Sequence, residues 1–194
     1  SLINEEDVKE ETIISEYLNL VVTSSEQLKE YINKLLTYYS SDNLIASKTR
    51  FPLADLISEI NQIVNANNEA EIVTDFDENL EIITDRTALS QILINIISNG
   101  IKYNTTDKPI IKITNNIVNL KSNISISDNG IGIDTQNFEA IFQNNKTLSK
   151  KDRYGNYGTG LGLSIVKNLT QKINFDIKVT SEIGKGSIFT LMEK

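Results

Sequence analysis

The sequence of 194 residues contains no cysteine and no histidine. Without cysteine the chain can form neither disulfide bonds nor thiolate metal sites, which fits a reducing compartment. We therefore expect a cytoplasmic location, with any membrane anchor of the intact protein lying upstream. Without histidine the chain has no imidazole base, no Ser-His triad and no His-ligated metal. The lack of histidine is the sharper constraint, because it removes all three at once.

The chain also lacks long apolar runs and a surplus of basic residues. Its longest hydrophobic stretches are too short to span a bilayer, and nothing in it resembles a signal peptide. The net charge of −7 argues against general nucleic-acid binding, which needs a basic surface. With 39% hydrophobic residues, the chain can bury the core of one domain and carry an appendage.

Glycine is missing from the first 99 residues. All nine glycines come later, and six of them fall into two clusters, Asp128–Asp134 and Gly155–Ser164. Glycine is favoured where the backbone must take a positive φ or where a ligand comes close. Because Asp128 opens the first cluster, the pattern suggests a nucleotide pocket in the C-terminal half.

The N-terminal segment predicts one long helix, from about residue 10 to residue 41. Its apolar positions alternate steps of three and four, which is the spacing of a coiled-coil or bundle seam. The stripe comprises Ile14, Leu18, Val21, Ser25, Leu28, Ile32, Leu35 and Tyr39, and it is widened by Tyr17, Leu20, Tyr31 and Tyr38. Such a face needs a partner helix. We therefore expect the chain to begin inside a helical hairpin and to form homodimers through this helix.

The rest of the chain predicts helices and strands that follow a polar, irregular connection at residues 40–50. Phe51-Pro52 marks the boundary, because proline disfavours a helical residue before it. We expect helices at 53–66, 86–103, 135–142 and 160–172, and strands at 71–75, 80–84, 110–118, 123–127, 176–180 and 187–192. Asp85 is placed to cap the second of these helices through its carboxylate.

Three polar residues share one face of that second helix. Asn95 and Asn99 are four residues apart, so both side chains can offer amide oxygens to a hard cation such as Mg²⁺. Lys102 adds a positive charge for phosphate on the same face. The alternative is that these are ordinary polar positions in a chain with 23 asparagines.

The first glycine cluster follows a predicted strand. Asp128 is placed to accept a hydrogen bond from an exocyclic amine, which separates adenine from guanine, and Gly130 and Gly132 would let the backbone approach the ring. The alternative is an ordinary Asp-Asn-Gly turn.

The second cluster, Gly158–Gly162, runs directly into a helix. Free N–H groups at a helix start, next to glycine amides, form an anion site suited to phosphates. The preceding stretch, residues 143–157, carries Lys146, Lys150, Lys151 and Arg153 against one acidic residue. It predicts a mobile lid over phosphates, although a solvated loop explains the charges nearly as well.

Taken in order, these segments resemble the ATP-binding catalytic domain of sensor histidine kinases, within the wider GHKL (Bergerat-fold) ATPase family. The matching segments are Gln91–Tyr103 (N box), Asp128–Gly132 (G1 box), Phe138 and Phe142 (F box), Gly158–Gly162 (G2 box) and the closing hairpin Ser181–Phe189. The resemblance implies an α+β fold, a two-layer α/β sandwich whose mixed sheet is covered by helices on one face. It covers residues 48–194, and residues 1–47 look like part of the family's dimerisation and phosphoacceptor hairpin, mostly its second helix.

The resemblance also implies roles for individual residues. Asn99 would ligate Mg²⁺ between the ATP phosphates with Asn95 beside it, and Lys102 would contact phosphate. Tyr103 would pack near the adenine and Asp128 would bind its amino group, with Gly130 and Gly132 alongside. The phosphates would lie against the G2 box, which comprises Gly158, Thr159, Gly160, Leu161 and Gly162. Gly100 departs from the family, which usually has alanine there.

Three functions compete at this point. The first is a histidine kinase core that passes the γ-phosphoryl of ATP to a histidine outside these residues, for relay to a response-regulator aspartate. The second is a hydrolytic ATPase, which is disfavoured because the hydrolytic relatives carry a glutamate base where this chain has Asn95. The third is a non-catalytic ATP-binding or dimerising regulator. We expect a truncated kinase, because the family's phosphorylated histidine lies on the first hairpin helix.

Overall fold

The computed structural model describes residues 47–118 and 121–194, together with scattered positions between residues 13 and 36. The chain divides into two compact units, Ser1–Tyr39 and Ser40–Lys194. The boundary expected from the sequence, between residues 47 and 48, stays a prediction.

In the first unit, the described positions are helical and exposed to solvent. Five apolar members of the predicted stripe lie among them, and each is at least 46% exposed: Ile14, Leu18, Val21, Leu28 and Ile32. Leu35 and Tyr39 lie outside the described residues, as do Leu20, Tyr31 and Tyr38 of the flanking set. In the part of the chain that the structure describes, no helix has the length and hydrophobicity needed to cross a membrane.

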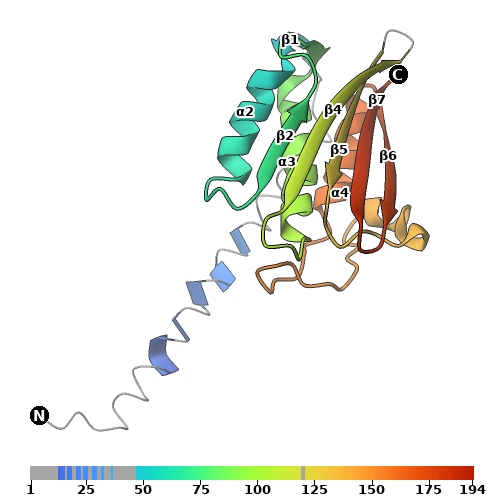
Figure 1. Ribbon diagram of the computed structural model, residues 1–194. Helices are drawn as coiled ribbons and strands as arrows, with labels where there is room; N and C mark the ends of the chain where they lie inside the picture. Colours follow the sequence, from blue (N-terminus) through green and yellow to red (C-terminus); the bar gives the residue numbers. More distant parts are fainter. Residues whose placement is uncertain are drawn as a thin grey trace, which may run out of the picture. The chain divides into compact units, whose positions relative to one another are not determined.

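The second unit consists of three α-helices, two short 3-10 helices and seven strands among the described residues (Figure 1). In chain order these elements are β1 (Thr49–Pro52), α2 (Leu53–Val64), β2 (Glu71–Asp75), β3 (Glu81–Thr84), α3 (Arg86–Lys102), β4 (Ile110–Val118), β5 (Lys121–Asp128), η1 (Thr135–Asn137), η2 (Ala140–Phe142), α4 (Gly162–Lys172), β6 (Phe175–Glu182) and β7 (Gly186–Glu193).

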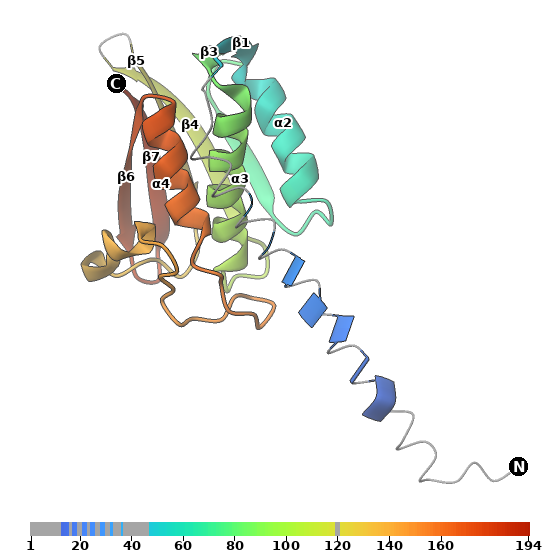
Figure 2. The same cartoon turned by 180° about the vertical axis from the view of Figure 1, so that it is seen from behind.

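Five of the strands form one mixed sheet in the order β2-β4-β5-β7-β6. The β2–β4 pair is parallel, and the other neighbours are antiparallel. All three α-helices lie on one face of this sheet, as the two opposite views show (Figures 1 and 2). The predicted α+β sandwich, with a mixed sheet covered on one face, is confirmed. β1 and β3 form a separate antiparallel pair.

The core lies between the sheet and the helices. Alternate residues of the central strands face the helices and are buried, such as Ile111 and Ile113 of β4 and Ile124 and Ile126 of β5. The helix α3 supplies the opposing surface through Leu89, Ile92, Leu93, Ile96, Ile97 and Ile101, all of them buried. Each such side chain contributes about 1.5–3 kcal/mol when it is removed from water. The other face of α3 is left for polar residues.

Asp85 caps α3 as predicted. One of its oxygens accepts a hydrogen bond from the Ala88 N–H at 2.8 Å, which satisfies a free donor of the first turn. The second oxygen accepts from the Ser47 N–H at 2.8 Å. The start of the helix is therefore fixed by a hydrogen bond within its first turn and by one from the segment that precedes β1.

Two sequence-based expectations are wrong in detail. The helix expected at residues 135–142 is a pair of 3-10 turns, η1 and η2. Asp134 closes the first turn by accepting from the Gln136 N–H at 2.9 Å, and so short a segment gains too little from α-helical bonds alone. The segment expected to be irregular up to Arg50 contains β1, whose last residue is Pro52. Proline is tolerated there because this strand has only one neighbour, β3.

Candidate functional site

The two predicted phosphate-side motifs meet where α3 packs against α4 (Figure 2). The Asn95 amide nitrogen donates to the Gln91 carbonyl at 2.8 Å, so its Oδ1 points away from the helix backbone. A Cβ placed on Gly162 would lie 3.0 Å from Asn95 Oδ1 and 3.8 Å from Asn99 Nδ2. The glycine therefore lets the start of α4 come close to both asparagines.

The helix α4 begins at Gly162 without a side-chain cap. Leu161, the residue before it, is buried in the core, so only its backbone can face the outside. Its N–H donates to the Thr159 hydroxyl at 3.4 Å. An uncapped helix start carries N–H groups that can bind an anion, and here it lies beside the asparagine pair.

Tyr103, at the end of α3, connects the two glycine clusters. Its carbonyl accepts from the Ile131 N–H at 3.1 Å, and the same carbonyl lies against Gly130. Its hydroxyl lies against Gly158. The preceding residue, Lys102, accepts from the Arg153 N–H at 2.9 Å through its backbone carbonyl. The end of α3 thus joins the first cluster, the second cluster and the predicted lid.

Asp128 lies at the end of β5 with one oxygen engaged. Its Oδ1 accepts from the Gly130 N–H at 2.8 Å and from the Ser187 N–H at 3.2 Å. Burial raises the pKa of this carboxyl, and the two backbone hydrogen bonds oppose that shift. Within the described residues, both hydrogen bonds of this side chain end on Oδ1, so Oδ2 is available to accept from a further donor.

Gly132 packs against the closing hairpin. Its φ is +70°, and a Cβ there would run into the carbonyl of Glu182. Next to it, the Ile133 N–H donates to the Ser181 hydroxyl at 2.8 Å, and the Gly184 N–H donates to the Ile131 carbonyl at 2.9 Å. The first glycine cluster is therefore fixed to the β6–β7 hairpin by its backbone.

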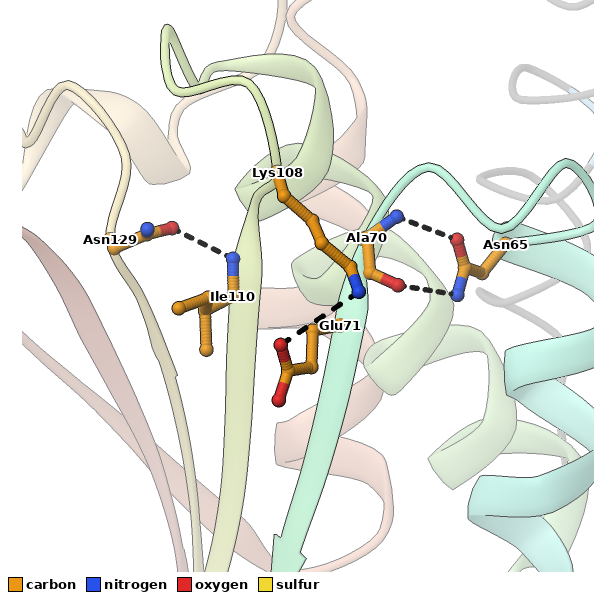
Figure 3. Close-up of polar contacts among 6 residues, drawn as sticks. All are labelled: Asn65, Ala70, Glu71, Lys108, Ile110 and Asn129. Carbon is orange, nitrogen blue, oxygen red and sulfur yellow. Dashed lines mark hydrogen bonds and ion pairs between the residues drawn. The ribbon is translucent and has the colours of Figure 1, made fainter.

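Sequence reasoning did not find the two asparagines that support the turn after Asp128. Asn104 is buried, and its amide donates to Asn129 Oδ1 at 2.7 Å. The same oxygen accepts from the Ile110 N–H at 2.8 Å (Figure 3). Asn129 thus links the end of β5 to the start of β4. The only signal in the sequence is the Asp-Asn-Gly turn itself, because asparagine is common throughout the chain.

The predicted lid, residues 143–157, packs against the rest of the site at both of its ends. Gly160 has a φ of +70° and lies against the backbone of Asn145 and Lys146. The Arg153 guanidinium donates to the Asp107 carbonyl at 3.4 Å. The side chains of the four basic residues, Lys146, Lys150, Lys151 and Arg153, are exposed.

A tight turn at residues 152–156 presents Tyr154. Asp152 Oδ1 accepts from the N–H groups of Tyr154 at 2.9 Å and Asn156 at 2.8 Å. The Tyr154 hydroxyl donates to the carboxylate of Glu69, which is 85 residues away in the sequence. Burial and this contact raise the pKa of Tyr154 to about 12, and the same hydrogen bond lowers the pKa of Glu69.

The turn that carries Glu69 is also well ordered by hydrogen bonds. The Asn65 side chain donates to the Ala70 carbonyl at 2.9 Å and accepts from the Ala70 N–H at 2.9 Å (Figure 3). The Asn67 amide donates to the other Glu69 oxygen at 3.2 Å. Two rigid turns therefore hold the Tyr154–Glu69 contact, which ties the lid to the connection between α2 and β2.

Comparison with known proteins identifies the family. The sequence model of the "histidine kinase-, DNA gyrase B-, and HSP90-like ATPase" family matches residues 84–193. The chain belongs to this family. The matched ATPase domain begins at the end of β3 and includes both glycine clusters, the asparagine pair and Asp128. Because the matched family is one of ATPases, ATP is the substrate of this domain.

The relatives include several proteins named as sensor kinases. ArlS of Staphylococcus aureus, a "signal transduction histidine-protein kinase", is 30% identical over 95% of this chain and 42% of its own length. The chain spans less than half the length of the curated relatives it matches, down to 10% of a hybrid signal transduction histidine kinase of Dictyostelium discoideum.

Solved structures of the ATPase domain have the same fold. The catalytic domain of histidine kinase ThkA is 26% identical, covers 76% of this chain and 95% of its own, and superimposes with a TM-score of 0.63. ThkA in complex with the response regulator TrrA gives a TM-score of 0.69 at 23% identity, over 93% of this chain and 51% of that one.

The lid contact generates a testable prediction. Tyr154→Phe removes only the hydroxyl that donates to Glu69, so the turn at residues 152–156 loses one of its attachments. We expect amide hydrogen exchange of residues 150–157 to become about two- to fivefold faster. Tyr157→Phe is the matched control, because Tyr157 offers its ring to Lys151 and phenylalanine keeps that ring. Equal exchange in both variants would refute the attachment.

Proposed function

We propose that this chain is the ATP-binding catalytic core of a sensor histidine kinase. In this proposal the γ-phosphoryl of Mg-ATP passes to a histidine outside the 194 residues and from there to an aspartate of a response regulator. One observation carries the proposal: Asn95 and Asn99 meet the glycine start of α4, while Asp128 keeps one oxygen available beside Gly100, the residue of α3 that follows Asn99. An anion site and an adenine acceptor therefore lie next to the same part of α3.

The identity of residue 95 favours transfer over hydrolysis. An amide cannot take a proton from water at neutral pH, and the Asn95 nitrogen already donates to Gln91. The chain also has no histidine that could act as a base. A neutral imidazole acceptor is itself a nucleophile, so its phosphorylation relies on positioning and on charge neutralisation.

The asparagine pair fits a role in holding Mg²⁺ together with phosphate oxygens. No group of three or more acidic, histidine or cysteine side chains gathers as a metal cage within the described residues. Mg²⁺ accepts amide oxygens and commonly completes its shell with water and substrate phosphates. Asn99 would supply such an oxygen after a rotation of its side-chain amide, because Nδ2 is the atom that faces Gly162. The ion would neutralise phosphate charge.

The remaining site residues divide between the two ends of the nucleotide. At the phosphate end we assign contacts to Lys102 and to the backbone of Gly158, Thr159, Gly160, Leu161 and Gly162. At the base end we assign Asp128 as the acceptor for the adenine amine, and Tyr103, Gly130 and Gly132 as its surroundings. Support comes from the contacts of Tyr103, which joins both glycine clusters.

The partners belong to the same proposal. A response-regulator receiver domain is supported by the complex of the structurally similar ThkA with TrrA. Homodimerisation through the N-terminal helix is supported by its exposed apolar stripe. Each proposal has a direct test.

The adenine assignment predicts nucleotide preference. We expect the protein to bind ADP and ATP in clear preference to GTP, because Asp128 Oδ2 can accept from the adenine amine but would face a carbonyl oxygen in guanine. Asp128→Asn should weaken ADP binding by about tenfold or more while the melting temperature stays close to that of the unmodified protein. Isothermal titration calorimetry measures the nucleotide affinities, and thermal unfolding measures the melting temperature. Equal affinity for ATP and GTP would show that Asp128 has another role.

The metal assignment predicts a loss of transfer. Asn99→Ala should lower Mg²⁺-dependent phosphorylation of a supplied histidine-containing kinase hairpin by about 100-fold or more, while ADP still binds. Asn116→Ala is the control, because Asn116 is an exposed asparagine of β4 outside the site. Transfer at the normal rate by Asn99→Ala would refute its role. The chain alone should take up no acid-labile label from ATP, since it has no histidine.

The dimer assignment predicts the effect of charge on the apolar stripe. Leu18→Glu combined with Leu28→Glu should give monomers that still bind ADP, because each buried leucine is worth about 1.5–3 kcal/mol. Ser24→Glu is the control, an exposed helical position outside the stripe. Sedimentation velocity measures the association state. A monomer at high micromolar concentration for the unmodified chain would exclude the dimer.

A further inference from the structure

Three glycines from three different elements surround Asp128. A Cβ on Gly130 would lie 2.8 Å from Asp128 Oδ1, and a Cβ on Gly186, at the start of β7, would run into the Asp128 carbonyl. A Cβ on Gly100, in α3, would lie 3.1 Å from Asp128 Cβ. Close backbone contact explains the glycine at residue 130, and a φ of +103° explains the one at residue 186. Gly100 lies inside a helix, where glycine is unfavourable and needs another explanation.

The side chain of Ile111, from β4, fills the space next to Gly100. Ile111 and Asp128 are direct partners across the β4–β5 pair, and both face the same point on α3. A Cβ on Gly100 would lie only 2.7 Å from Ile111 Cδ1. Ile111 is 0% exposed and lies in the packed core, so its side chain has little room to move away.

We propose that Gly100 is a positioning residue that sets how closely Asp128 lies against α3, and thereby the strength and selectivity of adenine binding. This inference rests on the proposed function of Asp128. The bulky Ile111 and the missing Cβ at residue 100 form a matched pair: the isoleucine occupies the volume that a methyl group on α3 would need.

Because Ile111 is packed in the core, we expect Asp128 or α3 to give way to a methyl group at residue 100, and either movement would disturb the base end of the site. If Asp128 moves, its Oδ1 moves away from the N–H groups of Gly130 and Ser187. The hydrogen bond to Ser187 is already the longer of the two, at 3.2 Å, so it is lost first. If α3 moves instead, the Tyr103 carbonyl shifts away from the Ile131 N–H. Both routes displace the turn that would face adenine.

The experiment compares four proteins: the unmodified chain, Gly100→Ala, Ile111→Val, and the double variant. Ile111→Val removes only Cδ1, the atom that a methyl group at residue 100 would meet. ADP and GDP affinities are measured by calorimetry, and melting temperatures are measured in parallel. Ser98→Ala is a further control, because Ser98 is a half-buried position of α3 away from Asp128.

We expect Gly100→Ala to bind ADP about fivefold more weakly or worse and to discriminate less between ADP and GDP. Its melting temperature should fall only slightly, because the higher helix propensity of alanine offsets part of the cost of overpacking against Ile111. Ile111→Val alone should change ADP affinity by less than about twofold, and adding it to Gly100→Ala should restore affinity to within about twofold.

The possible failures are distinguishable. If the unmodified chain prefers ADP to GDP and Gly100→Ala leaves that preference unchanged, the inference is wrong and the proposed function stands. Loss of ADP binding or of folding that Ile111→Val does not reverse also overturns it, since space would not be the cause. If the unmodified chain shows no preference for adenine, the function proposed for Asp128 fails first.

Discussion

Backbone atoms hold Asp128 in place, and the geometry of the whole site depends on this constraint. Two N–H groups fix one carboxylate oxygen, and glycine backbones from α3, the following turn and β7 limit the space around the residue. Backbone groups have fewer alternative positions than long side chains. The backbone contacts therefore fix the orientation of the Asp128 carboxylate, and with it the direction of its second oxygen. Burial makes the ionised form costly, and the two N–H groups reduce that cost.

The phosphate end is organised differently. There, two helices approach each other because Gly162 has no side chain between α4 and the asparagines of α3. The lid lies against Gly160 near this contact, and its outer part is attached through exposed side chains, such as Arg153 to Asp107 and Tyr154 to Glu69. The base end is thus held by backbone groups, whereas exposed side chains contribute to holding the lid at the phosphate end.

Local sequence signals predicted much of the fold. The bounds of β2 and β4 agree with the expectation, and α3 begins at Arg86 because Asp85 satisfies the first turn from a neighbouring position in the chain. β1 was not predicted from the sequence, because this strand is stabilised by pairing with β3, about 30 residues away. A local sequence pattern cannot predict such a distant pairing. The expected helix after Asp134 failed for a related reason, since only tertiary contacts could have made up for its short length.

The candidate site was predictable where a motif carries its own chemistry, as in Asn95, Asn99 and Asp128. Contacts between distant side chains were not. Tyr154 and Glu69 are both ordinary polar residues in the sequence, and nothing in it says that their turns meet. The pairing of Gly100 with Ile111 likewise depends on the register between a helix and a strand, which is a property of the folded chain.

The parallel strand β2 has a consequence for how such a domain can be divided. The family match begins at residue 84, yet β2 pairs with β4 along its whole length and α2 packs against α3. A polypeptide cut at that residue would leave the β4 edge without its neighbour and one side of α3 uncovered. A portion that folds by itself therefore needs β2 and α2 in addition to the stretch that the family model matches. A gene fusion or excision that kept only the matched stretch would expose the edge of β4 and the apolar side of α3 to solvent.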